Sequence, residues 1–192
     1  MDCALFYFCG MEPQMIVLET ERMSLKAVTP EVYEYLMTNK TDDELKAFFG
    51  YATEKELASE KLRHEKKMVC YYQTFRRFVM VDKTTGSTIG QCGYHKWYND
   101  HNKAEIGYAL NNEDIKRKGY MGEALAPIVA HGFSEMQLNR IEAFTSPQNV
   151  PSIKLLQNMG FQYEGVMRGH YLKAGVYEDS SCYALLKEEY GG

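Results

Sequence analysis

Hydrophobic and polar positions in the first half of the chain predict a strand, a helical segment and a hairpin. Residues 16–28 alternate and predict the strand, and Thr29 followed by Pro30 is typical of a helix start. A polar helical pattern then runs from residue 30 to about residue 68 and is interrupted near Gly50. Residues 75–83 and 87–98 are strand-like runs joined by a turn at 84–86, so we expect a hairpin.

The second half of the chain alternates between strand-like and helix-like segments. We expect strands at 103–110, 140–145, 161–169 and 179–187, and helices at about 120–136 and 150–159. Gly160 would stop the second of these helices. A strand, helix, strand order places parallel neighbours in the middle of a sheet and crossover helices on its faces. The chain is therefore predicted to form a mixed α/β (α+β) sheet with flanking helices.

Composition limits the classes of protein to which the chain can belong. Of its 192 residues, 45% are hydrophobic and 25% are charged, which suits one compact domain, expected here over residues 15–192. Met11 and Met15 could each be an alternative start, so residues 1–14 would be an N-terminal extension, either unstructured or forming a capping strand. The net charge of −4 argues against a general binder of nucleic acid or acidic membranes, since such partners require a broad basic surface.

Cysteine and histidine usage predicts a cytoplasmic protein without a metal site. The five cysteines are an odd number and include no Cys-x-x-Cys pair, so we expect reduced thiols. The apolar run at residues 4–8 lacks the basic start of a signal peptide and is too short to span a bilayer. Four scattered histidines lack metal-ligand spacing: His95, His101, His131 and His170.

One basic stretch stands out in this mildly acidic chain, "DIKRKGYMGEA" at residues 114–124. It follows a predicted strand and enters a predicted helix, where free backbone N–H groups and the helix dipole can bind a phosphate. Arg117 and Lys118 would screen the phosphate charge, and Gly119 permits a conformation that a side chain forbids. A solvated basic helix start explains the stretch equally well.

Several motifs in one order resemble the GNAT superfamily of acetyl-CoA-dependent N-acyltransferases, and within it the branch of the ribosomal-protein N-terminal acetyltransferases. They are "LETERMSLKAVTPE", "EIGYAL", "KRKGYMGEAL", "RIEAFTSPQNVPSIKLLQNMGFQYEG" and "GVYEDSSCYALLKEEY". The resemblance covers about residues 16–190. It implies the GNAT fold with a mostly antiparallel sheet, acetyl-CoA as cosubstrate, no metal and a primary amine as acceptor. It is also compatible with a homodimer.

The resemblance further implies which residues hold acetyl-CoA. The family's Q/R-x-x-G-x-G/A loop falls on residues 116–121, with Lys116 in place of Gln or Arg and Met121 in place of Gly or Ala. Main-chain groups of residues 106–110 would face the pantetheine where that strand separates from residues 140–145. Asn149 would contact the polar arm of the cofactor, although a helix cap explains it as well. The implied set is Ile106, Gly107, Tyr108, Ala109, Leu110, Lys116, Arg117, Lys118, Gly119, Tyr120, Met121, Gly122 and Asn149.

Acetyl transfer also needs proton transfers, and the resemblance implies candidates for them. Glu105 would be the general base, acting through a water, or else an ordinary solvent-facing strand residue. Ser152 and Tyr108 are candidate acids for the leaving thiolate, and Tyr183 is a further alternative. A helix start explains Ser152 as well, and core packing explains the tyrosines. The backbone N–H near Tyr108 would polarise the thioester carbonyl.

The sequence leaves the acceptor open among three hypotheses. The leading one is the α-amine of a protein or peptide N-terminus, as in the ribosomal-protein enzymes. The alternative is a small-molecule amine acetyltransferase for polyamines, aminoglycosides or amino acids, which would have a closed acidic pocket. The third is a non-catalytic acyl-CoA sensor. Glu44, Glu54 and Glu56 could attract a cationic acceptor, yet helix solvation explains them equally well.

Overall fold

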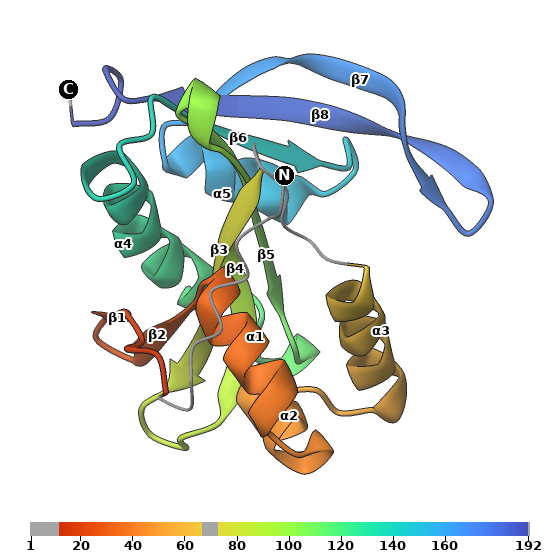
Figure 1. The fold of residues 1–192 in the computed structure, drawn as a ribbon. Coiled ribbons are helices and arrows are strands. Elements are labelled where there is room, and N and C mark those ends of the chain that lie inside the picture. Colours follow the sequence, from red (N-terminus) through yellow and green to blue (C-terminus); the bar gives the residue numbers. More distant parts are fainter. Residues whose placement is uncertain (1–11, 67–72, 192) are drawn as a thin grey trace, which may run out of the picture.

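The computed structural model describes residues 12–66 and 73–191 and contains one eight-stranded sheet in this part of the chain (Figure 1). The strands lie in the order β1-β2-β3-β4-β5-β6-β8-β7, and only β5 and β6 are parallel neighbours. The predicted mixed, mostly antiparallel sheet is therefore confirmed. The strands are β1 (Val17–Glu19), β2 (Met23–Val28), β3 (Thr74–Asp82), β4 (Thr88–Tyr98), β5 (Lys103–Leu110), β6 (Arg140–Thr145), β7 (Gln162–Lys173) and β8 (Val176–Leu186).

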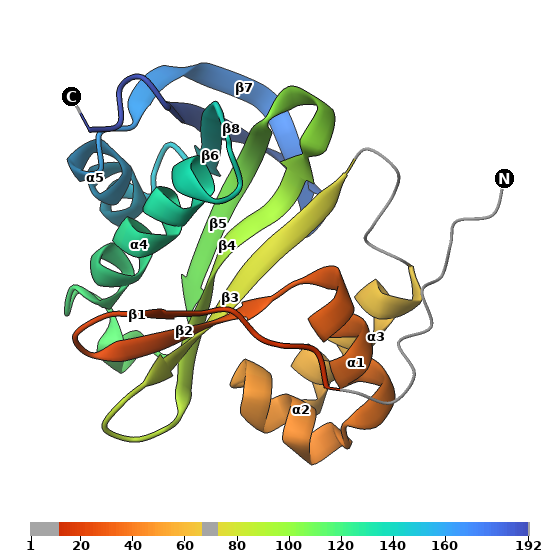
Figure 2. The ribbon, with the colours of Figure 1, turned by 60° about the vertical axis from the view of Figure 1, so that its left-hand side comes forward.

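Helices cover both faces of this sheet (Figure 2). On one face α4 and α5 pack against β4, β5 and β6, and on the other face three short helices form a separate apolar cluster with β2 and β3. Residues 1–11, which include most of the expected N-terminal extension, lie outside the described residues. The helices are α1 (Pro30–Asn39), α2 (Asp42–Phe49), α3 (Glu54–Glu65), α4 (Tyr120–Ser134) and α5 (Val150–Asn158), with 3₁₀ turns η1 (Asn99–His101) and η2 (Glu113–Ile115).

The prediction of one strand over residues 16–28 is wrong. The structure has two antiparallel strands, β1 and β2, with a reversal at residues 20–22 between them. Thr20 closes the reversal, because its backbone N–H donates to Met23 O at 2.9 Å and its Oγ1 accepts from Met23 N at 3.0 Å. No glycine or proline marks this turn, so the hydrophobic alternation continues through it and hides it.

The helical segment from residue 30 onward is three helices rather than two. Besides the expected break at Gly50, α1 ends at Asn39 and α2 begins at once after Thr41. Thr41 and Thr53 each form a reciprocal capping box with the glutamate three residues later. Such a box gives hydrogen-bond acceptors to two backbone N–H groups at the helix start that would otherwise be unpaired. A new helix can therefore begin here without a glycine or proline. The end of the expected segment, residues 67 and 68, lies outside the described residues.

Tyr94 fixes α4 against the sheet. Its ring is fully buried, and its hydroxyl donates to the backbone oxygen of Ile128 at 2.9 Å. A Cβ at position 132 would lie 2.2 Å from that hydroxyl, so Gly132 is required for the contact. Because β4 carries Tyr94 and pairs with β5, this contact also positions the start of α4 relative to β5.

His131 on α4 lies buried beside a cation. Arg76 Nη1 donates to His131 Nε2 at 3.0 Å, and the imidazole is only 7% exposed. Burial and the nearby Arg76 charge lower the pKa of His131 below its ordinary value. The unfolded chain therefore binds more protons than the folded chain once the pH falls below that ordinary value.

We expect the free energy of unfolding to decrease between about pH 7 and about pH 5, and to decrease less in His131→Gln, whose amide does not titrate. Urea unfolding at several pH values measures both slopes. The exposed His101 supplies the control, since His101→Gln should keep the wild-type slope. An unchanged slope in His131→Gln would contradict the assignment of this pH dependence to His131.

Candidate active site

The parallel pair β5 and β6 separates along its length. Their residues pair only at Lys103 with Arg140, Ala104 with Ile141 and Glu105 with Glu142. Beyond these pairs, residues 106–110 remain bonded to β4 on one side and face an open gap on the other. Successive side chains point to opposite faces, so Tyr108 lies on the side of α4 and α5, and Glu105 lies on the opposite side. The separation that the family resemblance implies is therefore confirmed.

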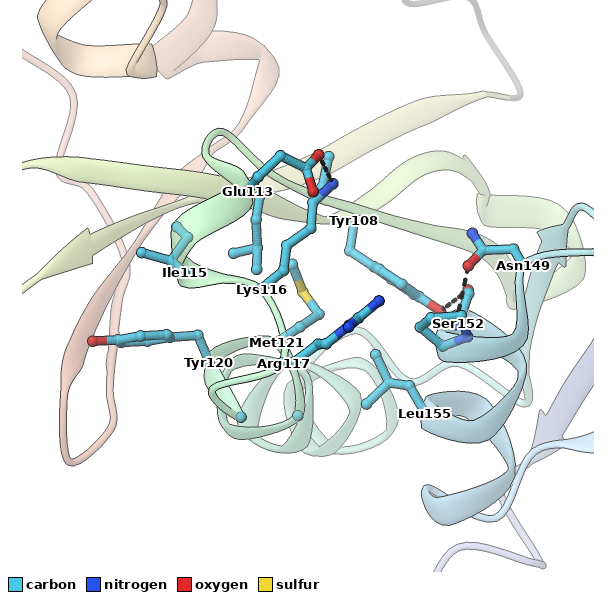
Figure 3. Close-up of a pocket in the computed structure, with 15 residues that line it drawn as sticks. Tyr108, Glu113, Ile115, Lys116, Arg117, Tyr120, Met121, Asn149, Ser152 and Leu155 are labelled. Atoms are coloured by element: carbon cyan, nitrogen blue, oxygen red, sulfur yellow. Dashed lines mark hydrogen bonds and ion pairs between the residues drawn. The ribbon is translucent and has the colours of Figure 1, made fainter.

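A cavity of about 820 Å³ lies beside this gap, between β5, the loop after it and the first turns of α4 and α5 (Figure 3). Most of the residues expected to hold acetyl-CoA line it, whereas Ile106, Gly107 and Lys118 do not. The expected residues in its wall are Tyr108, Ala109, Leu110, Lys116, Arg117, Gly119, Tyr120, Met121, Gly122 and Asn149, together with Ser152. The sequence did not predict the others, which are Glu113, Ile115, Pro151 and Leu155.

The start of α4 presents free backbone donors to this cavity. Arg117 and Gly119 both have a left-handed backbone, with φ of 62° and 82°, and Gly119 caps the helix without a side-chain bond. The first backbone N–H of this turn with a protein acceptor belongs to Glu123, which donates to Gly119 O at 3.0 Å. Among the described residues, the N–H groups of residues 117–122 have no such acceptor. Free N–H groups and the positive end of the helix dipole together favour an anion here.

The three basic side chains of the loop are used differently. Lys116 is paired with Glu113 on the preceding turn η2. Figure 3 shows Arg117 extending from the loop into the space next to Ser152, and among the described residues it has no acidic partner. Lys118 does not line the cavity, and its backbone oxygen accepts from Arg22. Arg117 is therefore the cation that the loop leaves available for a ligand.

Arg22, which sequence reasoning missed, holds this loop from the other side. Its guanidinium donates to Glu123 Oε2 at 2.6 Å and to Lys118 O at 3.0 Å, and it stacks over the Tyr120 ring at 4.1 Å. Thr20 donates to the other oxygen of Glu123 at 2.7 Å. The β1–β2 turn thus fixes the first turn of α4. No local signal could reveal this, because the partners are about a hundred residues apart in the chain.

The two candidate acids, Tyr108 and Ser152, lie together. The Tyr108 hydroxyl and Ser152 Oγ are 2.7 Å apart, at the end of the cavity nearest α5 (Figure 3). Burial raises the pKa of Tyr108, so the hydroxyl keeps its proton at neutral pH. Asn149 is the cap of α5, because its Oδ1 accepts from Ser152 N at 3.3 Å. Tyr183, the other candidate acid, is buried beside Tyr163 and lines neither this cavity nor the one described below.

Glu105 lies on the opposite face of β5, in a polar cluster that the sequence did not predict. His95 Nε2 lies 2.8 Å from one carboxylate oxygen, and Lys96 Nζ donates to the other at 2.9 Å. Tyr171 on β7 donates to the first oxygen at 3.3 Å. Burial disfavours the charge of Glu105, but the bonds from His95 and Lys96 outweigh it and lower the pKa of Glu105 to about 2.

A second cavity of about 260 Å³ opens on this face, and Tyr108 and Ala109 line both cavities. It therefore adjoins the first cavity across β5. Cys92 contributes to its wall but is buried, and burial raises the pKa of its thiol well above the ordinary value. A neutral buried thiol is a poor nucleophile. The remaining wall residues are Arg77, Gln91, Gly93, His95 and Gly107.

A family model described as "Acetyltransferase (GNAT) domain" matches residues 21–162 of the chain. The chain belongs to this family. The N-acetyltransferase p20 of Bacillus licheniformis, itself described as uncharacterised, is 33% identical over 180 residues, which are 93% of this chain and 100% of that protein. The GNAT assignment inferred from the sequence motifs is thereby confirmed, and with it an acetyl-CoA-dependent N-acyltransferase.

Two solved structures share the GNAT fold with this chain. The ribosomal-protein-S5-alanine acetyltransferase of Vibrio fischeri gives a TM-score of 0.62 at 21% identity, over 92% of this chain and 100% of its own. A mutant form of the spermidine/spermine N-acetyltransferase SpeG of Vibrio cholerae gives 0.63 at 18% identity, over 88% of this chain and 96% of its own. At these identities the likeness shows the fold alone.

The large cavity fits the cosubstrate of the GNAT family. Acetyl-CoA supplies an acetyl thioester and carries a pyrophosphate, and the free N–H groups of residues 117–122 with Arg117 form an anion site of suitable chemistry. Met121, the departure from the family motif, packs partly against the core below the loop.

In residues 12–66 and 73–191 no group of three His, Cys, Asp or Glu could hold a metal ion. None of the helices described there is long and apolar enough to cross a membrane.

We expect Gly119→Trp to weaken acetyl-CoA binding by at least about tenfold, because an L-residue at φ 82° strains the loop and its Cβ would lie 3.4 Å from Nη2 of Arg22, so that the indole would displace the side chain that holds the loop. Calorimetric titration measures the dissociation constant. Gly175→Trp is a matched control, since Gly175 has φ 84° and open space around it at the β7–β8 turn. Equal binding by both variants would show that the cofactor does not use this loop.

Proposed function

We propose that this GNAT enzyme transfers the acetyl group of acetyl-CoA directly to the α-amine of a protein or peptide N-terminus. Acetyl-CoA would bind in the large cavity on one face of β5, and the amine would enter through the small cavity on the other face. Both cavities share the wall formed by Tyr108 and Ala109. This arrangement supports a ternary complex, in which positioning both reactants supplies much of the rate.

The charge of the small cavity is the observation that carries the choice of acceptor. Among the described residues, its wall contains Arg77 and no carboxylate. Arg77 is only partly neutralised there, because the fully buried Glu60 that it contacts at 2.8 Å also pairs with Arg63 at 2.6 Å. A site for a polyamine needs acidic groups to replace the water around several positive charges. A single terminal amine with a pKa near 8 is already partly neutral and makes no such demand.

The acidic residues of α2 and α3 support the same choice. Glu44 and Glu56 accept from the cap threonines of their own helices, and Glu54 pairs with Lys46 at 2.6 Å. Their charges therefore serve the helix ends rather than an acceptor pocket. The names of the two solved neighbours include both a ribosomal-protein and a spermidine enzyme, so fold likeness alone does not choose between these acceptors.

The test is thiol release from acetyl-CoA with a panel of acceptors. The panel contains short peptides with free Ala, Ser, Thr or Asp N-termini, the same peptides with blocked N-termini, spermidine and an aminoglycoside. We expect release with the free peptides alone. Release with spermidine or the aminoglycoside alone would overturn the proposal in favour of a small-molecule enzyme. Binding of acetyl-CoA without release for any acceptor would favour the acyl-CoA sensor.

Within this function we assign Tyr108 as the group that gives its proton to the leaving thiolate, with Ser152 as its hydrogen-bond partner. Tyr108→Phe should therefore lower kcat by about 100-fold while the acetyl-CoA dissociation constant changes little. Steady-state kinetics with calorimetry separate the two effects. Tyr190→Phe, at a partly exposed tyrosine near the end of the chain, is the control. A wild-type kcat in Tyr108→Phe would exclude this role.

A further inference from the structure

Beside the small cavity, strand β4 carries one more residue than its partner strand β5. The pairing passes from Tyr94 opposite Ile106 to Lys96 opposite Glu105, and His95 is the extra residue of this bulge. Tyr94 and Trp97 both pack into the apolar cluster on the side of α4. The intervening His95 and Lys96 therefore both lie on the opposite face, where they meet Glu105.

The bulge pairs an accessible imidazole with a buried carboxylate. The side chain of His95 is 37% exposed, whereas that of Glu105 is 7% exposed. The carboxylate is held on both oxygens, by His95 and Tyr171 on one and by Lys96 on the other. A substrate in the cavity can therefore reach His95, whereas Glu105 lies behind it.

Glycine at position 107 lets the imidazole lie against β5. A Cβ there would come within 2.8 Å of His95 Nδ1 and 2.9 Å of Cε1, so any side chain would displace the ring. Among the described residues Nδ1 has no hydrogen-bond partner. An ionised carboxylate can only accept a hydrogen bond, so a neutral His95 carries its proton on Nε2 and a free lone pair on Nδ1.

We propose that His95 takes the proton of the acceptor amine on Nδ1, and that Glu105 is a positioning residue that fixes the tautomer and orientation of the ring. The proposal rests on the N-acetyltransferase function proposed above. It replaces the expectation that Glu105 itself is the general base. The geometry is that of a carboxylate that orients a histidine while the other ring nitrogen handles the proton.

The protons of the reaction balance with this assignment. The acceptor ammonium gives one proton to Nδ1, and His95 later releases it to solvent. The amine nitrogen then bonds to the acetyl carbon as the carbon–sulfur bond breaks. The sulfur takes a proton from Tyr108, which regains one from the nitrogen. A carboxyl with a pKa near 2 would hold the first proton far less well, which agrees with a positioning role for Glu105.

The charges around the ring also suit a transient imidazolium. Lys96 neutralises the second oxygen of Glu105, and Arg77 on β3 lines the same cavity but is bonded to Glu60. Tyr171 approaches from β7 as a neutral hydroxyl, and burial raises its pKa. Glu105 is thus the anion that directly contacts the ring, and it would be the counter-charge when His95 is protonated.

The experiment compares His95→Gln, Glu105→Gln and the exposed control His101→Gln. With a free peptide acceptor, His95→Gln should lower kcat by about 100-fold and leave the calorimetric acetyl-CoA dissociation constant and Tm near wild type. Imidazole added to His95→Ala should restore part of the lost rate. His101→Gln should behave as wild type.

A second readout needs no turnover. In the ¹⁵N-labelled protein without ligand, the ring nitrogen shifts of His95 at about pH 8 should show a proton on Nε2 and a bare Nδ1. Glu105→Gln should weaken that preference, which a merely structural role for Glu105 would not do.

Three results would overturn the proposal. The first is a wild-type rate in His95→Gln together with a large loss in Glu105→Gln, which would make Glu105 the base. The second is a proton on Nδ1 in the wild-type protein. The third is a wild-type protein that binds acetyl-CoA and acetylates no amine. That result would overturn the proposed function as well, whereas the first two would leave it standing.

Discussion

The separation of β5 from β6 is the constraint on which the rest of the site depends. In a continuous sheet, the backbone groups of residues 106–110 would be bonded on both sides and could not receive a ligand. Here they are bonded to β4 only, because β6 leaves after Glu142. The separation lies where the two cavities adjoin, because Tyr108 and Ala109 of β5 line both of them.

The opening is supported by contacts that lie far from it. Tyr94 inserts against Gly132 and fixes α4 from the sheet side, while Arg22 and Glu123 fix its first turn from the β1–β2 side. A loop with two left-handed residues would otherwise be costly to hold in one shape. The anion site is thus prepared by packing on both sides before any ligand arrives, which reduces the entropy lost on binding.

The sequence predicted the features that depend on neighbours along the chain. The loop before α4 was visible in its glycines and basic residues, and the hairpin of β3 and β4 in its alternation and turn. The sequence did not reveal what depends on pairing across the chain. The reversal at residues 20–22 carries no turn residue, and the contacts of Arg22 join distant segments. In the sequence His95 is one of several scattered histidines, because a bulge shows in the register of strand pairing and not in the types of the residues around it.

That bulge has a consequence for how such a site can arise or disappear. Without His95, Tyr94 and Lys96 would be adjacent, and regular alternation would place Tyr94 and Trp97 on the core side and Lys96 on the opposite side. Pairing with Ile106 and Glu105 would continue without interruption, and the core face would keep both aromatic residues. The histidine is therefore an insertion that the sheet tolerates rather than a substitution within it. A change of one residue in chain length could add or remove this group and leave the folded core intact.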